Sequence, residues 1–99
     1  MGLIRRHRPK RLAEKLRIIR VALGLSQGGM LKRLGLDEDG DRSTISGYER
    51  DEREPPLPVL LEYARAANVY VDALVDDEVD LPAKIPAKDK VAGVKSRNF

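Results

Sequence analysis

The strongest constraint on the fold is a series of short amphipathic segments, each followed by a residue that ends helices. In the first segment, Leu12, Leu16, Ile19 and Leu23 follow one another at spacings of four and three residues. This spacing places all four side chains on one face of a helix. Gly24 comes next, at the position where a left-handed cap ends a helix. The pattern therefore predicts a first amphipathic helix, and it favours an all-α fold.

A second helix is predicted directly after this glycine. Ser26 is a good N-cap residue, because its hydroxyl can accept a free N–H of the first turn. Met30, Leu31 and Leu34 would form the buried face, and Gly35 would end the helix.

A third helix is predicted over residues 41–50, after an acidic turn at residues 37–40. Asp41 would be its N-cap. Ile45 and Tyr48 would share its buried face, because they are three residues apart. The other positions are mostly polar or small, so we expect them to face outward and to stay available to a partner.

Two further helices complete the predicted bundle. Pro58 suits the first turn of a fourth helix, and Asn68 suits its left-handed cap. The expected buried face of this helix comprises Leu57, Leu60, Leu61, Ala64 and Ala67. A short fifth helix is expected near Val71 to Val75.

The helical pattern covers only the middle of the chain, residues 10–76, which we expect to form the domain. Residues 1–9 are basic, and we expect them to be a flexible arm. Residues 77–99 contain lysines and prolines without a helical period, and we expect them to be a mobile tail. The net charge is +3, and basic ends suit a polyanion such as nucleic acid.

Composition excludes or disfavours several classes of function. The chain has no cysteine, which excludes disulfides, thiolate metal sites and cysteine nucleophiles. Neither a signal peptide nor a membrane span is apparent, so we expect a soluble cytoplasmic protein. His7 is the single histidine and has no carboxylate near it in the sequence, so we do not expect an enzyme.

A metal site is also not expected. The aspartates of residues 37–41 alternate as calcium ligands do, but Arg42 and Tyr48 stand where an EF-hand loop needs glycine and glutamate. We interpret this segment as a solvated turn, and we expect no cofactor.

The order and spacing of several short motifs carry a resemblance to a known family. The motifs are Leu25-Ser26-Gln27, Leu34-Gly35, Ser43-Thr44-Ile45-Ser46, Tyr48-Glu49-Arg50 and Leu60-Leu61-Glu62-Tyr63-Ala64, with Val69 and Asp72. Together they resemble the phage-repressor family of helix-turn-helix proteins, the lambda Cro type of the xenobiotic-response-element family. The resemblance implies a compact five-helix bundle of the lambda-repressor-like DNA-binding type.

The resemblance also implies roles for particular side chains. Ser26 and Gln27 would place the N-terminus of the second helix against a DNA phosphate. The DNA-binding positions of the third helix and of the loop after it would be Arg42, Ser43, Thr44, Gly47, Arg50 and Arg53. Arg20 and Glu49 would form a structural ion pair between the first and third helices.

Some residues depart from the family pattern. Residues 37–40 make the turn between the second and third helices longer than the family turn. Residues 51–54 are largely acidic where a phosphate-facing loop prefers cations, which leaves Arg50 and Arg53 to contact phosphates. Gly47 has no side chain to read a base, where the family usually has a longer residue.

Two functions from different classes follow. The leading hypothesis is a sequence-specific transcriptional regulator of the nucleoid, a repressor that binds a palindromic operator in double-stranded DNA as a homodimer. Candidates for its dimer surface are Val69, Val71, Leu74 and Val75. The alternative is a protein-interaction module, such as an antitoxin or a regulatory subunit, that uses the same fold to bind a protein partner.

Overall fold

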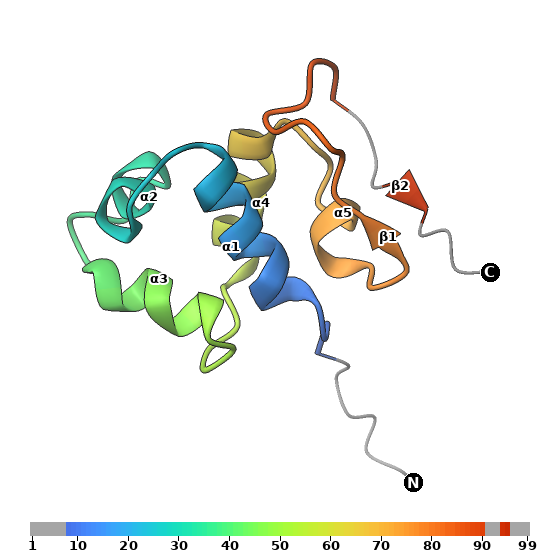
Figure 1. Cartoon of the computed structure of the whole chain (residues 1–99). Helices are drawn as coiled ribbons and strands as arrows, with labels where there is room; N and C mark the ends of the chain where they lie inside the picture. The colour runs from blue at the N-terminus through green and yellow to red at the C-terminus, as the bar shows by residue number, and fades with distance from the viewer. Residues whose placement is uncertain (1–7, 91–93, 96–99) are drawn as a thin grey trace, which may run out of the picture.

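The computed structural model describes residues 8–90 and 94–95, so most of the predicted basic arm lies outside the described residues. Its elements are α1 (Leu12–Ala22), α2 (Gln27–Arg33), α3 (Arg42–Glu49), α4 (Leu57–Ala67), α5 (Asp72–Val75), β1 (Val79–Asp80) and β2 (Val94–Lys95). Helix α1 runs through the middle of the molecule, with α2 and α3 on one side and α5 with β1 on the other (Figure 1). The predicted all-α bundle is confirmed.

Residues with a left-handed backbone follow three of the helices, where the sequence predicts caps. Gly24 follows α1 with φ of +72°, and Gly35 follows α2 with φ of +75°. Asn68 ends α4 with φ of 57° and ψ of 48°. Glycine adopts this conformation without a steric penalty, and asparagine is one of the few other residues that visit it. These three predicted caps are confirmed.

The core lies where α1, α2, α3 and α4 meet. Its completely buried large side chains include Leu16, Ile19, Met30, Ile45 and Tyr63. Burying an aliphatic side chain of this size contributes about 1.5–3 kcal/mol. The predicted inner faces of the first three helices are therefore confirmed.

The predicted buried face of α4 is partly wrong. Leu57 is 75% exposed and Leu61 is 36% exposed, although both were expected inside. Val59 is buried instead, and the spacing of Tyr63 correctly predicts that it packs in the core, as does the predicted Leu60. Tyr63 is completely buried, so the buried face of α4 is the side of the helix that carries Tyr63.

Lys15 is completely buried, although it is a charged residue within the first amphipathic segment. Its Nζ atom donates to the carbonyl oxygens of Ala73 at 2.9 Å, Asp76 at 2.8 Å and Val79 at 2.8 Å. An ammonium group has three protons to donate, and these contacts use all of them. Burial lowers the pKa of Lys15 below its usual value. Through these hydrogen bonds, Lys15 connects α1 to the segment between α5 and β1.

The start of α1 is held by residues far along the chain. The carboxylate of Asp77 accepts the backbone N–H of Lys10 at 2.9 Å and that of Arg11 at 3.0 Å. The guanidinium of Arg11 donates to the carbonyl of Val79 at 3.3 Å and to the carboxylate of Asp80 at 2.6 Å. The hydrogen bonds from Lys10 and Arg11 hold the pKa of Asp77 below its usual value.

Residues 77–90, which the sequence predicts as part of a tail, pack on the bundle in the structure. Ala87 is buried, and its N–H donates to the carbonyl of Ala67 at 2.9 Å. The side-chain amide of Asn68 donates to the carbonyl of Ala87 at 2.7 Å. Strand β1 pairs with β2 in an antiparallel arrangement. Single contacts such as these leave no repeating pattern in the sequence, which is why periodicity missed them.

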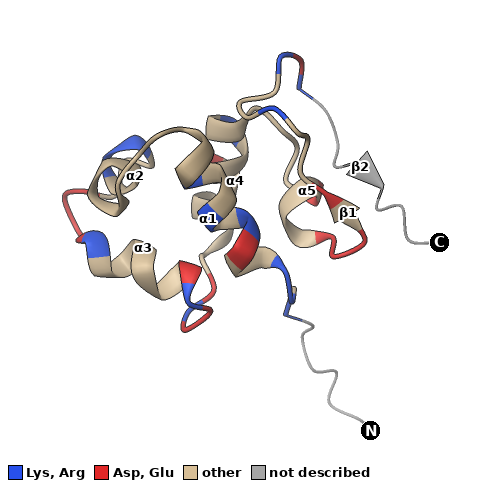
Figure 2. Cartoon of the chain, viewed as in Figure 1, with Lys and Arg blue, Asp and Glu red and all other residues tan. Residues whose placement is uncertain are grey.

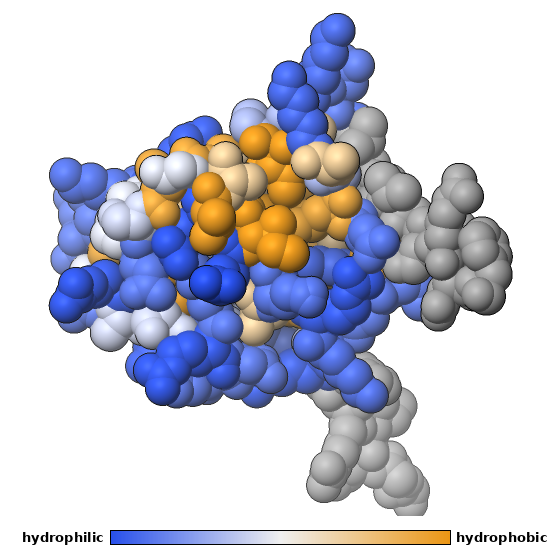
Figure 3. Space-filling model, viewed as in Figure 1, coloured by the Kyte–Doolittle hydropathy of each residue, from blue (hydrophilic) through white to orange (hydrophobic). Residues whose placement is uncertain are grey.

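The surface carries an apolar patch on the face where α1 lies in front (Figure 3). Helix α1 exposes two large apolar side chains, Ile18 at 44% and Val21 at 57%. Val69 and Leu74 were candidates for a dimer surface, but both are completely buried, so they are excluded from it.

No described helix is both long enough and apolar enough to cross a membrane.

Candidate nucleic-acid interface

The N-terminus of α2 is capped as the sequence predicts. The hydroxyl of Ser26 accepts the N–H of Gly29 at 3.0 Å. The first N–H groups of a helix have no carbonyl partner within it, so those of Gln27 and Gly28 stay available to an anion. The side-chain amide of Gln27 lies 3.5 Å from Glu49 on α3, which connects the two helices.

The N-terminus of α3 is capped by Asp41, also as predicted. Its carboxylate accepts the backbone N–H of Ser43 at 2.9 Å and the hydroxyl of the same serine. These hydrogen bonds hold the pKa of Asp41 below its usual value. Because the Ser43 hydroxyl proton is directed at Asp41, the Oγ atom offers lone pairs to a partner and would accept an N–H from a base.

The outer face of α3 is opposite Ile45 and carries Ser43, Gly47 and Arg50, which follow one another at spacings of four and three residues. Ser43 and Arg50 are exposed, as is Arg42 at the start of the helix. Gly47 was also expected to be available, and this expectation is wrong. Gly47 is buried, because another side chain covers it.

The side chain over Gly47 belongs to Arg53. A Cβ atom built on Gly47 would lie 3.5 Å from Nε and 3.6 Å from Cδ and Cγ of Arg53. The carbonyl of Gly47 also accepts the N–H of Glu52 at 2.9 Å and that of Arg53 at 3.2 Å. The loop after α3 therefore folds back onto the helix at the one position that has no side chain.

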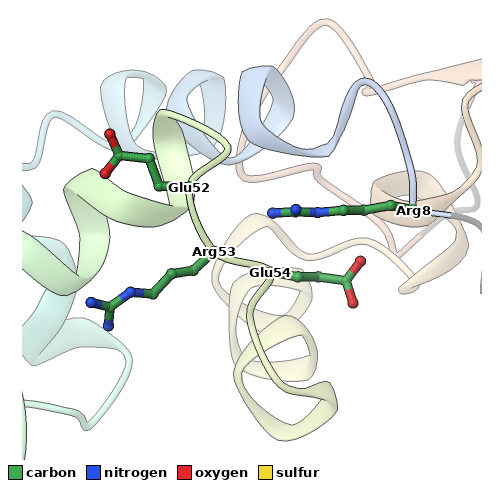
Figure 4. A pocket seen from close by; sticks show the side chains of 4 residues that line it. All are labelled: Arg8, Glu52, Arg53 and Glu54. Atoms are coloured by element: carbon green, nitrogen blue, oxygen red, sulfur yellow. The ribbon is translucent and has the colours of Figure 1, made fainter.

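Arg53 also lines an open pocket with Arg8, Glu52 and Glu54 (Figure 4). Its side chain and that of Glu54 extend in opposite directions from the loop, and Arg8 reaches the loop from the Glu54 side. Arg8 forms an ion pair with Asp51 of this loop, and 3.2 Å separates Nη2 of Arg8 from Oδ1 of Asp51.

The ion pair between α1 and α3 that the family resemblance implies is present. Nε of Arg20 lies 2.7 Å from Oε2 of Glu49, and Nη2 of Arg20 donates to Oε1 at 3.0 Å. The Glu49 side chain is only 4% exposed and that of Arg20 is 15% exposed. The hydrogen bonds that Arg20 donates to the carboxylate of Glu49 raise the pKa of Arg20. This two-point contact fixes the angle of α3 against α1.

The longer turn between α2 and α3 is closed by its own hydrogen bonds. The carbonyl of Leu36 accepts the N–H of Asp39 at 3.3 Å and that of Gly40 at 3.0 Å. A Cβ atom on Gly40 would lie only 3.0 Å from Oγ1 of Thr44 and 3.5 Å from Leu31. The turn thus packs against α3, and Thr44 is half-buried with its hydroxyl beside the turn.

Acidic residues lie at both ends of α3 (Figure 2). Residues 37–39 precede the helix, and residues 51–54 follow it. Nε of Arg50 lies 3.4 Å from Oε2 of Glu52, so one cation of the outer face has an acidic neighbour. Between these acidic residues, the positive charge beside the outer face of α3 comes from Arg42, Arg50 and Arg53.

The excess positive charge of the chain comes from its ends. All acidic residues lie within residues 8–90, whereas Arg5, Arg6, Lys95 and Arg97 lie outside this range. The net charge of +3 therefore becomes slightly negative when the ends are left out. In the part of the chain that the structure describes, no group of three or more acidic or histidine side chains is placed to hold a metal ion.

The chain matches a known protein family. The family model for the helix-turn-helix domain matches residues 11–77, which include all five helices. No curated protein and no solved structure matches the chain.

Proposed function

Because the chain belongs to the helix-turn-helix domain family, we propose that it is a sequence-specific DNA-binding transcriptional regulator. The observation that carries this proposal is the arrangement of α2 and α3. Helix α3 presents a polar outer face next to the capped N-terminus of α2, and the Arg20–Glu49 pair holds it in place. The major groove of B-DNA is wide enough to admit one α-helix, such as α3.

Each side chain at the interface would have its own role. Arg42 at the start of α3 would donate to guanine, a contact worth about 1–3 kcal/mol of discrimination. Ser43 would accept from a base, and Thr44 would contribute at the edge of the interface. Ser26 and Gln27 would place the N-terminus of α2 at a phosphate. Arg50 and Arg53, which follow Gly47 in the chain, would supply positive charge at the other end of α3.

We further propose that the protein binds as a homodimer to a palindromic operator and represses transcription by occupying it. A single domain of this size buries little DNA, and two copies would read half-sites about one helical turn apart. The basic ends of the chain would add contacts to the DNA backbone. The protein would then act in the cytoplasm, at the nucleoid.

A titration of duplex DNA at increasing salt tests this proposal. Preferred duplexes are first selected from a random pool, and binding is then followed by fluorescence anisotropy. We expect the logarithm of the affinity to fall linearly with the logarithm of salt concentration, with a slope of about −0.9 for each phosphate contact. If neither random nor selected duplexes bind at low salt, the protein is not a DNA-binding regulator.

The acidic residues at both ends of α3 favour a second candidate function. They would repel phosphates beside the helix, and they suit the basic surface of a protein partner instead. The protein would then be an interaction module, such as an antitoxin or a regulatory subunit. Failure to bind any duplex, together with a protein complex that weakens when residues 51–54 are neutralised, would support this function.

A further inference from the structure

We propose that Arg53, which lies on the loop after α3, supplies the base-reading side chain that Gly47 lacks. The inference rests on the proposed DNA-binding function and deepens it. It assigns to Arg53 a role in sequence preference, where the sequence alone pointed to a phosphate contact.

The position of Gly47 allows Arg53 to take the role of the missing side chain. Gly47 lies between Ser43 and Arg50 on the outer face of α3, at the centre of the surface that would enter the groove. A side chain at this position would point toward the bases, but glycine has none. The space is instead filled by Arg53, whose Nε, Cδ and Cγ atoms lie in van der Waals contact with the place of a Cβ atom.

The loop holds Arg53 in this position. The N–H groups of Glu52 and Arg53 both donate to the carbonyl of Gly47, at 2.9 and 3.2 Å. These bonds fix the backbone at the point where the Arg53 side chain begins. A side chain that is already placed against the helix loses less freedom on binding, which favours a defined contact over a diffuse one.

The surrounding charges leave the guanidinium of Arg53 available. Arg8 pairs with Asp51, and Arg50 lies beside Glu52, but Arg53 forms no ion pair with any residue that the structure describes. Figure 4 shows it extending away from Glu54. The planar guanidinium donates two parallel hydrogen bonds, which match O6 and N7 of guanine in the major groove. Guanine is therefore the base that we assign to Arg53.

The packing distances predict which changes at Gly47 would disturb this arrangement. Distances of 3.5–3.6 Å are ordinary van der Waals contacts, so alanine at position 47 would leave Arg53 in place. A longer side chain, such as glutamine, would occupy the space of Arg53 and displace it. Gly47→Ala is therefore a control for Gly47→Gln.

The test measures binding to the selected duplex and to a set of duplexes that each differ from it at one base pair. In the wild type we expect one guanine whose replacement lowers affinity about tenfold and whose effect depends on Arg53. Arg53→Ala and Arg53→Lys should both remove this preference, because lysine keeps the charge but not the planar pair of donors. Preferences at the other base pairs should persist.

The variants at position 47 complete the test. Gly47→Ala should retain the preference, whereas Gly47→Gln should remove it, and Arg53→Ala added to Gly47→Gln should have no further effect at that base pair. Circular dichroism checks that each variant is folded.

Two results would overturn the inference while the proposed function stands. In the first, Arg53→Ala weakens all duplexes equally and Arg53→Lys restores them, which identifies a phosphate contact. In the second, Gly47→Gln keeps the same guanine preference as the wild type. If the wild type binds no duplex at low salt, the proposed function fails and the inference fails with it.

Discussion

Lys15 shows how one residue can fix two distant parts of the chain. Its ammonium group is completely buried and donates to three carbonyls around the end of α5 and the start of β1. A buried charge is costly unless its hydrogen bonds are satisfied, and here they are. The position was open to prediction, because Lys15 lies three residues after Leu12 and four before Ile19, on the inner face of α1.

Replacing Lys15 tests whether these contacts stabilise the fold. Lys15→Met keeps a side chain of similar length but removes all three of these hydrogen bonds. The carbonyl of Val79 keeps the hydrogen bond from Arg11 and that of Asp76 keeps the one from the N–H of Val79, whereas the carbonyl of Ala73 loses its donor. We expect the free energy of unfolding in urea to fall by about 1–3 kcal/mol, the cost of an unsatisfied buried acceptor. Arg17→Met on the exposed face of the same helix is the control and should change stability by less than about 0.5 kcal/mol. Equal effects would contradict the assigned role.

The capping and the inner faces of the first three helices were predictable at the scale of single elements. Ser26 and Asp41 cap the helices that the sequence assigns to them, and Gly24 and Gly35 take left-handed conformations. These features depend on neighbouring residues, so local chemistry determines them. The covering of Gly47 was not predictable, because it depends on how a loop folds back in space.

Two adjacent glycines in the first turn of α2 provide a matched pair of substitutions. A Cβ atom on Gly28 would lie 4.0 Å from the hydroxyl of Ser26, whereas one on Gly29 would lie 3.3 Å from it and press on the cap. Gly28→Ala should raise the free energy of unfolding by about 0.5–1 kcal/mol, through helix propensity. Gly29→Ala should gain about 1 kcal/mol less, since it disturbs the cap. Equal gains in urea unfolding would argue against the cap.

The Arg20–Glu49 pair joins α1 to α3 and has a clear mutational signature. Arg20→Met alone leaves the carboxylate of Glu49 buried without its partner, and Glu49→Leu alone leaves Arg20 without its own. We expect each single change to lower the free energy of unfolding by about 3 kcal/mol. The double variant should recover much of this loss. Additive losses in a double-mutant cycle would show that the two side chains are not coupled.

At the scale of the whole molecule, the fold closes on itself through residues that carry no helical pattern. The segment after α5 contacts the start of α1 through Asp77. It contacts the end of α4 through the hydrogen bond between Asn68 and Ala87. The sequence of this segment has no helical period, so it predicts a tail and gives no sign of these contacts. Packing by single side chains is a property of the assembled bundle and has no local signature.

The contacts of Asp77 predict a dependence of stability on pH. Its pKa is lowered in the folded state, so its contribution is present above the ordinary pKa of about 3.9 and is lost as pH falls through the folded value. Asp77→Asn should lower stability at pH 6 by about 1 kcal/mol, as the loss of an N-cap does. The difference from wild type should shrink toward pH 2. Asp89→Asn, at an exposed position, is the control and should change stability at pH 6 by less than about 0.5 kcal/mol.

The central claim is that the outer face of α3 and the N-terminus of α2 form the surface that meets DNA. Amide NMR spectra of the ¹⁵N-labelled protein, titrated with a selected duplex, test it most directly. We predict that the largest shifts occur at residues 26–29, 42–47 and 53, whereas the amides of α1 around Ile18 change little. Shifts confined to the apolar surface of α1, with residues 42–47 unchanged, would contradict the account.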